Sequence, residues 1–211
     1  FKTGHLAVAK QHVPFAGIRQ EPLLDFEDNF QGNKLKVEWN WNYPYSDIDA
    51  VVKKGQLSLS GILKGGGEHG TALCLRSQSP DYTCETKVVN ANQSLKGLTL
   101  YGDDKNHVVW GTSGDKLLLK VVKDNVESVL YETVYLDKEI YLKTEVERGY
   151  IFHFFWSKDG KTWNLVNNTS SEGNDLIRWD RVQRPGLLHN GAKNSPAEFA
   201  YFKMRIKKRT L

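Results

Sequence analysis

The sequence predicts an all-β domain built as a sandwich of two antiparallel sheets. Short runs of β-branched and aromatic residues recur at roughly 8–12-residue spacing, with Gly, Asp and Asn between them. Residues Gln56 to Ile62 alternate strictly between polar and apolar side chains, as a half-buried strand does. No window carries a sustained 3.6-residue apolar period, so we expect no helix beyond one short turn over 174–181.

The composition is that of a soluble globular protein of one domain. The chain has 211 residues, of which 39% are hydrophobic, 11% aromatic and 26% charged. Because no apolar run reaches about 18 residues, we expect no membrane span. The net charge is only +4. We expect the basic residues near the end of the chain to solvate the last strand rather than to bind nucleic acid; these are Lys203, Arg205, Lys207, Lys208 and Arg209.

Two parts of unequal size follow from the pattern. Residues 1–24 are irregular, with Pro14, Gly17 and Pro22 interrupting any period, and we interpret them as a lead or linker segment. Residues 25–211 form the single sandwich domain. The first residue is Phe1, which predicts a processed or excised piece of a longer chain. We expect a periplasmic or secreted location.

Turn residues delimit the expected strands. Lys54-Gly55, Asp103–Asn106, Lys123–Asn125 and Asp159-Gly160 are hairpin signals. Residues 39–49, with Pro44 and two aspartates, are expected to form a loop. The predicted runs are 56–62, 71–77, 81–89, 98–101, 107–111, 116–122, 126–135, 139–146, 150–156, 163–166, 186–188 and 197–206.

The two cysteines allow one bridge at most. Cys74 and Cys84 lie on the runs 71–77 and 81–89, on either side of a Ser-Pro-Asp turn. If these runs pair about residue 79, the cysteines face each other and a cross-strand disulfide can form. Two reduced, buried cysteines are the equal alternative. Their spacing, without a second Cys or His pair, does not predict a zinc site.

The common catalytic patterns are absent from the sequence. Gly65-Gly66-Gly67 lacks the Lys-Ser/Thr of a phosphate-binding loop, and the histidines are scattered. Carboxylates gather in three places, any two of which could approach in the fold as a glycosidase pair requires. Turn chemistry explains such residues equally well. They are Asp25, Glu27 and Asp28; Asp47 and Asp49; and Asp103 and Asp104.

Aromatic side chains are the best candidates for a binding surface. Trp39, Trp41, Tyr43 and Tyr45 fall within seven residues beside Pro44. Indole faces stack on sugar rings, so this segment could form a carbohydrate platform or meet another domain. The competing interpretation is that one or two of these rings plug the end of the core. His69, in the Gly-rich loop 64–70, and Trp179 complete the candidates, and we expect both loops to be exposed near a concave face or rim.

Several segments, in order, resemble the concanavalin A-like C-terminal domain of glycoside hydrolase family 43, which includes β-xylosidases and α-arabinofuranosidases. The resemblance runs from about residue 25 to 206 and rests on segments 28–42, 57–59, 81–86, 96–101, 155–163, 184–187 and 197–202. It implies a jelly-roll sandwich. It also implies that the catalytic acids sit on a separate five-bladed propeller upstream, which this domain would support, with a loop near the substrate pocket.

The resemblance implies a xylan-type or related oligosaccharide as the substrate of the whole enzyme, and no cofactor. Sandwiches of this type often carry an Asp at the position of Ala200, and that Asp helps hold a structural calcium ion. Because this chain has alanine there, we do not expect the ion. Three functions remain open. The chain is an accessory, non-catalytic domain of such an enzyme, a free-standing lectin-like module, or a small sandwich glycosidase.

Overall fold

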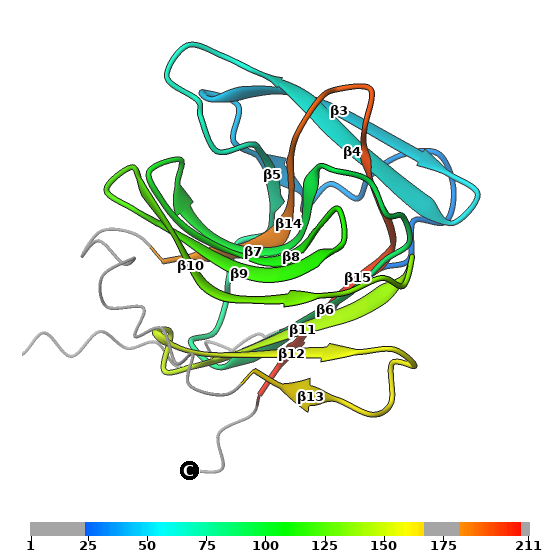
Figure 1. Cartoon of the computed structure of the whole chain (residues 1–211), viewed down its shortest axis with the longest axis vertical. Coiled ribbons are helices and arrows are strands. Elements are labelled where there is room, and N and C mark those ends of the chain that lie inside the picture. Colours follow the sequence, from blue (N-terminus) through cyan, green and yellow to red (C-terminus); the bar gives the residue numbers. More distant parts are fainter. Residues whose placement is uncertain (1–23, 167–181, 208–211) are drawn as a thin grey trace, which may run out of the picture.

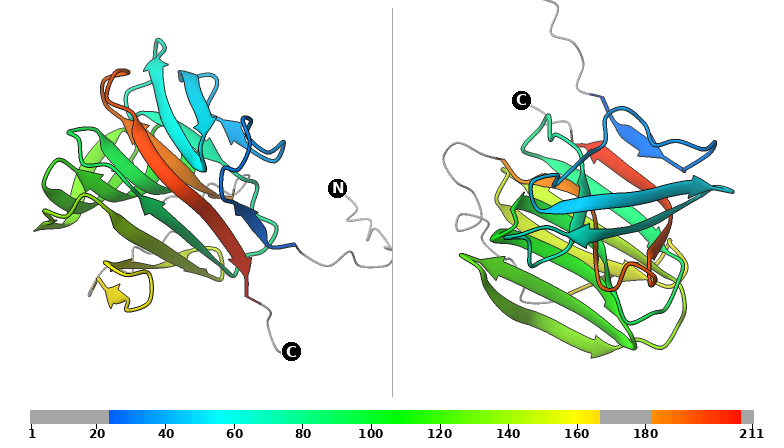
Figure 2. Two further views of the ribbon diagram at one scale, coloured as in Figure 1. Left: turned by 90° about the vertical axis from the view of Figure 1, so that its right-hand side faces the viewer. Right: turned by 90° about the horizontal axis from the view of Figure 1, so that it is seen from above.

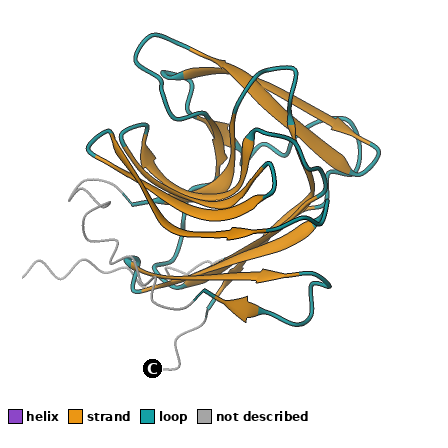
Figure 3. Cartoon of the chain, in the orientation of Figure 1, coloured by secondary structure: helices purple, strands orange, loops and turns teal. Residues whose placement is uncertain are grey.

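Two antiparallel β-sheets make up the part of the chain that the computed structural model describes, residues 24–166 and 182–207 (Figure 1). These residues contain strands and loops only, as the orange and teal ribbons of Figure 3 show. They include no helix that could cross a membrane. The expected all-β sandwich is therefore confirmed, and the views in Figure 2 show the sheets packed on one another.

Sheet A has eight strands, and its order follows the chain only in the hairpins β3–β4 and β11–β12–β13. β1 pairs with β15 beside the main path of the sheet. From edge to edge, the path is β13 (Asn164–Leu165), β12 (Ile151–Ser157), β11 (Ile140–Glu147), β6 (Tyr82–Val88), β15 (Ala197–Ile206), β4 (Gln56–Leu63) and β3 (Ser46–Lys53), with β1 at Phe26–Asp28.

Sheet B has seven strands and is strongly curled in Figure 1. Its order is β10 (Val126–Val134), β9 (Lys116–Lys123), β8 (Asn106–Ser113), β7 (Leu95–Asp103), β14 (Arg184–Asn190), β5 (Thr71–Cys74) and β2 (Asn40–Trp41). The run from β7 to β10 is a meander of consecutive hairpins, whereas β14 inserts between β7 and β5 from far along the sequence.

Local turn chemistry explains the hairpins. Lys54 and Gly55 both have positive φ, 54° and 73°, between β3 and β4. Asp124 and Asn125 adopt the same left-handed conformation, at 48° and 69°, between β9 and β10. Two consecutive left-handed residues match the twist of the flanking strands, and Asn, Asp and Gly adopt that conformation most readily.

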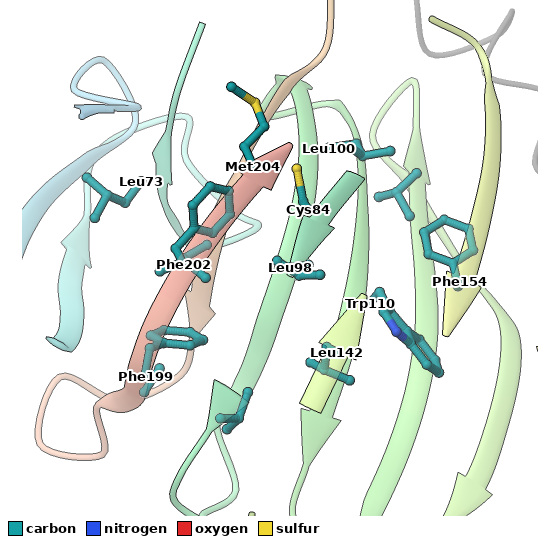
Figure 4. Close-up of a cluster of buried hydrophobic side chains, with 14 of the residues drawn as sticks. Leu73, Cys84, Leu98, Leu100, Trp110, Leu142, Phe154, Phe199, Phe202 and Met204 are labelled. Atoms are coloured by element: carbon teal, nitrogen blue, oxygen red, sulfur yellow. The ribbon is translucent and has the colours of Figure 1, made fainter. Parts of the chain in front are cut away.

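The main core lies between the sheets. On β9, Leu117 and Leu119 belong to it, and they are fully buried. Trp110 of β8 crosses the interior, and its indole N–H donates to the backbone carbonyl of Phe155 in sheet A at 2.8 Å. Figure 4 shows this indole close to Phe154, whose ring centroid lies 6.1 Å away.

The outer faces of the two sheets differ. Along β11 of sheet A, buried and partly exposed residues alternate, as expected for a strand with one solvated face. The central strands β7 and β8 of sheet B are buried on both faces almost throughout. A second apolar cluster covers the other side of sheet B, and consists of Ala72, Cys74, Leu95, Tyr101, Val109, Leu118 and Leu188. Sheet B therefore carries a second face that is also largely buried.

Two expectations about the chain path are wrong. Asp47 and Asp49 lie on β3, an edge strand, rather than in a loop. The runs 71–77 and 81–89 do not form a hairpin, because β5 pairs with β14 and β2 while β6 pairs with β11 and β15. Both errors concern pairing with strands distant in sequence, which no local pattern specifies.

Candidate functional site

Several loops meet at one end of this second face of sheet B. The β4–β5 loop, residues 64–70, lies against the β7–β8 turn and the β9–β10 turn. In Figure 1 this cyan loop stands above the tips of the two green hairpins. The β2–β3 segment, residues 42–45, contacts the same loop from the other side, because the Lys64 amide donates to the carbonyl of Tyr45 at 2.9 Å. We define these segments as the rim.

His69 ties the β4–β5 loop to the β9–β10 hairpin. Its side chain is 6% exposed. Nδ1 lies 2.9 Å from Glu127 Oε1, and Nε2 lies 3.2 Å from Asn125 Oδ1. The amide group of Asn125 donates in turn to Glu68 Oε2 at 2.9 Å. The sequence singled out His69 for its place in a Gly-rich loop, and the structure makes it a tertiary contact rather than an exposed ligand.

Asn42 is the second tie. Its Oδ1 accepts hydrogen bonds from the Ala72 amide at 3.0 Å and from the Ser46 hydroxyl at 2.6 Å. Its Nδ2 donates to the Gly70 carbonyl at 2.9 Å and to the Tyr101 hydroxyl at 3.2 Å. Both polar atoms of the buried amide thus have partners, and Asn42 joins the β2–β3 segment to β5 and to Tyr101 of β7.

Asp104 is a fully buried carboxyl at the β7–β8 turn. Its Oδ2 accepts the Glu68 amide at 3.0 Å, whereas Oδ1 has no partner within the described ranges. Burial raises the pKa of Asp104 above its ordinary value. The neighbouring His107 stacks on Tyr101 with ring centroids 5.4 Å apart, and burial lowers the pKa of His107 to about 4. His107 is therefore neutral near pH 7.

The carboxylate of Glu127 behaves differently from that of Asp104. Burial raises its pKa, but hydrogen bonds and charge from Lys120 and His69 outweigh burial, so the pKa of Glu127 falls below its ordinary value. An ionised Glu127 and a buried Asp104 thus flank His69. None of these contacts places two solvent-open carboxylates across a cleft.

The aromatic segment divides between surface and core. Trp41 and Tyr43 are exposed, at 43% and 66%, and their rings meet edge to face with centroids 6.4 Å apart. Tyr45 is half-buried. Trp39 is buried, which favours the competing interpretation that one or two of these rings plug the end of the core. Its indole N–H donates to Asp28 Oδ2 at 2.9 Å.

The cross-strand disulfide, one of the two alternatives that the sequence leaves open, is not formed. Cys74 and Cys84 are both free and buried, one on β5 of sheet B and the other on β6 of sheet A. The alternative of two reduced cysteines is the one the structure adopts. Burial raises the pKa of the Cys74 thiol to about 12, so this thiol is a poor nucleophile near pH 7.

The remaining candidates from the sequence are Trp179, the position of Ala200 and the basic residues near the end of the chain. Trp179 lies outside the described residues. Ala200 is on β15, and residues 24–166 and 182–207 contain no group of three or more His, Cys, Asp or Glu side chains that could hold a metal ion. Three basic residues of the last strand and its end pair with carboxylates on sheet A: Lys203 and Arg205 with Glu27, and Lys207 with Glu145 and Glu147.

A second surface feature lies where the described chain begins. A groove of about 330 Å³ runs between β1, the segment before β2 and the end of β5. Val37 on its border is 96% exposed, and Leu24 is 66% exposed. The lining is completed by Asp25, Phe26, Glu38, Asn40, Leu75, Arg76, Gln78 and Met204. Exposed apolar side chains around a groove favour a contact with another protein surface.

Sequence reasoning missed the polar residues that hold the rim together. Asn42, Glu68 and the pair Asn125 and Glu127 come from three separate segments, and each is unremarkable in its local context. Asp104 was identified only as one of two turn carboxylates.

We expect Asn42→Ala to lower the free energy of unfolding by about 2 kcal/mol, because it leaves the Ala72 amide and the Gly70 carbonyl without their partner. Urea unfolding of the purified chain measures this loss. Asn40→Ala is the matched control, because the Asn40 side chain is exposed and bonds only to the Glu38 carbonyl, so its effect should stay within about 0.5 kcal/mol. Equal effects of the two substitutions would show that Asn42 does not hold the rim.

Comparison with solved structures places this architecture beside known glycosidases. The family 43 glycoside hydrolase BlXynB of Bacillus licheniformis matches with a TM-score of 0.69 and 14% identity, over 86% of this chain and 39% of that one. Xylan beta-1,4-xylosidase of Bacillus halodurans matches with a TM-score of 0.64 and 23% identity, over 92% and 41%. This chain thus spans about two fifths of those proteins. At such identities, the likeness shows the fold.

A lectin-like protein shares the fold more distantly. The lumenal domain of VIP36, solved with calcium and Man3GlcNAc bound, matches with a TM-score of 0.50 and 8% identity, over 82% of this chain and 86% of that one. No curated protein matches the sequence. The sequence pattern of one family, described as the beta xylosidase C-terminal concanavalin A-like domain, matches residues 27–181, which is well over half of the chain. The chain therefore belongs to this family.

Proposed function

We propose that the chain is the accessory, non-catalytic sandwich domain of a family 43-type glycoside hydrolase that acts on xylan-type glycans. The family match over residues 27–181 carries this proposal. The length relation supports it, because the chain corresponds to only 39% and 41% of two similar enzymes and so to one domain of such a protein. An enzyme that attacks polymeric xylan meets its substrate outside the cytoplasm, so we also propose a periplasmic or secreted location.

The contacts of the carboxylates favour a non-catalytic role. Asp28 accepts hydrogen bonds from the Phe30 amide at 2.9 Å and from the Trp39 indole. Glu27 pairs with Arg205, and the hydrogen bond from Arg205 is the main cause of its lowered pKa. Asp103 accepts the Lys105 amide at 3.0 Å within its turn. These are structural roles, whereas a glycosidase needs one acid of raised pKa facing a second carboxylate across the substrate.

The groove beside β1 is a suitable surface for the catalytic domain. It combines the apolar side chains of Phe26, Leu75 and Met204 with the charged Arg76 and Glu38. The described part of the chain begins at this groove, because Leu24 itself lines it. A domain joined there would cover Val37 and Leu24, and covering exposed apolar surface stabilises the assembly.

A free-standing carbohydrate-binding module is the second candidate, and the exposed pair of Trp41 and Tyr43 favours it. Their edge-to-face arrangement leaves aromatic surface open beside the rim. Aromatic faces bind the apolar faces of sugar rings. The saccharide bound to the similarly folded lumenal domain of VIP36 shows that this sandwich fold is compatible with glycan binding.

The sequence of the full gene product tests the proposed function. A five-bladed propeller with its catalytic carboxylates encoded upstream of Phe1 would support the accessory role. A complete gene that encodes this sandwich without such a domain would contradict it and favour the module.

We expect the isolated chain to release no nitrophenol from aryl xylosides or arabinofuranosides, because Asp25, one of the two exposed carboxylates that line the groove beside β1, is already engaged by the Ile206 amide and by Arg205. Activity that disappears when a carboxylate of this chain is replaced would contradict the proposal. The module is tested separately by titration calorimetry with xylo-oligosaccharides. There, Trp41→Ala should abolish any binding, while Val134→Ala, exposed on β10 at the opposite edge of sheet B, should leave it intact.

A further inference from the structure

The hydrogen bonds around His69 define its protonation. Glu127 Oε1 is an acceptor 2.9 Å from Nδ1, and Asn125 Oδ1 is an acceptor 3.2 Å from Nε2. The orientation of the Asn125 amide follows from its other end, because Nδ2 donates to Glu68 Oε2 and the oxygen must then face the imidazole. An imidazole donates from both nitrogens only when it carries both protons. The geometry therefore fits a charged His69.

Ionisable groups from several elements surround the His69 ring. Glu127 comes from β10, the Asp104 carboxyl from the β7–β8 turn, and Glu68 from the loop itself. Lys120 of β9 lies on the far side of Glu127, with which it forms an ion pair. The ring of His107 on β8 lies 5.6 Å away, measured between centroids, but burial lowers its pKa to about 4, so it adds no positive charge above about pH 5.

The side of the β4–β5 loop that faces the hairpins has few attachments besides His69, whereas its other side is bonded to Tyr45 and Asn42. Gly66 and Gly70 have positive φ, and nothing lies within 4 Å of a Cβ built on Gly65 or Gly66. Glycines make a loop costly in entropy to order. Beyond His69, the side of the loop that faces the hairpins is held by the Glu68 amide on Asp104 and by the Glu68 carboxylate on Asn125.

We propose that His69 is a protonation-dependent clasp, whose charged ring holds the β4–β5 loop closed over the β7–β8 turn and whose neutral ring releases it. The neutral ring keeps one proton, so it loses the hydrogen bond to either Glu127 or Asn125. Release uncovers Asp104, whose Oδ1 has no partner in the described part of the closed structure. The surface beside Trp41 and Tyr43 therefore depends on pH: the β4–β5 loop covers the β7–β8 turn in mildly acidic solution and leaves it uncovered in mildly alkaline solution. This clasp is intrinsic to the domain and does not rest on the proposed function.

Hydrogen exchange at the Glu68 amide, followed by NMR on the full chain, reports directly on the clasp. We compare protection factors, corrected for the intrinsic pH effect, at about pH 5.5 and about pH 8, which bracket the usual titration of an imidazole. The protection of Glu68 should fall about tenfold or more at the higher pH, the scale of a lost charge-assisted hydrogen bond. The amide of Leu142, in the centre of sheet A, should not change in the same direction.

Variants identify the titrating group. His69→Gln should show low Glu68 protection at both pH values, whereas His153→Gln, on β12 of the other sheet, should retain the wild-type pH dependence. Asp104→Asn keeps an oxygen that can accept the Glu68 amide. This variant should therefore also retain the wild-type pH dependence of Glu68 protection. Protection that is equal at the two pH values in the wild type overturns the clasp. So does a pH dependence that survives in His69→Gln or vanishes in Asp104→Asn.

Discussion

Replacing Trp39 with alanine is expected to lower the free energy of unfolding by about 3–5 kcal/mol, the range for a buried Trp or Phe truncated to alanine. The indole is 7% exposed and packs edge-on against Phe26 and Phe202, with ring centroids 5.4 and 5.1 Å away. Alanine leaves a cavity between these rings. It also removes the donor that satisfies Asp28 Oδ2, so a buried carboxylate loses a hydrogen bond.

Trp41→Ala is the matched control for this result. Trp41 is two residues further along the chain and 43% exposed, so its loss should cost less than about 1 kcal/mol. Trp39→Phe separates packing from hydrogen bonding, because it keeps much of the ring but not the N–H. We expect an intermediate loss of about 2 kcal/mol. Guanidinium unfolding of the four proteins measures all three differences, and similar losses for Trp39→Ala and Trp41→Ala would contradict the division between core and surface.

Gly111→Ala should cost about 3 kcal/mol, because the added methyl group has no space between two central strands of sheet B. Gly111 on β8 pairs with Gly97 on β7. A Cβ on Gly111 would lie 2.1 Å from the Lys96 carbonyl oxygen and 3.0 Å from the Gly97 Cα. Backbone atoms cannot rotate away, so β7 and β8 must separate, which disturbs the neighbouring Trp110 in the main core.

Gly65→Ala provides the control for this substitution. Gly65 has no atom within 4 Å of an added Cβ, so we expect a change within about 0.5 kcal/mol. The measurement is the urea midpoint at constant m-value. If Gly111→Ala unfolds at the same midpoint as wild type, the close approach of β7 and β8 does not exist in solution.

The sequence alone determined the fold class and most of the strands. Alternation from Gln56 to Ile62 became β4, and the signals at Lys54-Gly55 and Lys123–Asn125 became two tight turns. These features are encoded within a few residues, because side-chain alternation and positive φ depend on the local backbone. The family resemblance depended on the order of such local segments, and the family match confirmed it.

Only the tertiary structure decided which strands pair and which side chains meet. The separation of Cys74 and Cys84 into different sheets follows from the insertion of β5 beside β14 and of β15 beside β6. Trp39 and Trp41 have similar neighbours in the sequence. Only Trp39 meets a buried partner, Asp28 of β1, which accepts its indole N–H. The rim around His69 likewise joins separate loops. Long-range pairing depends on the burial of the whole sheet, so these contacts exist only once both sheets are assembled.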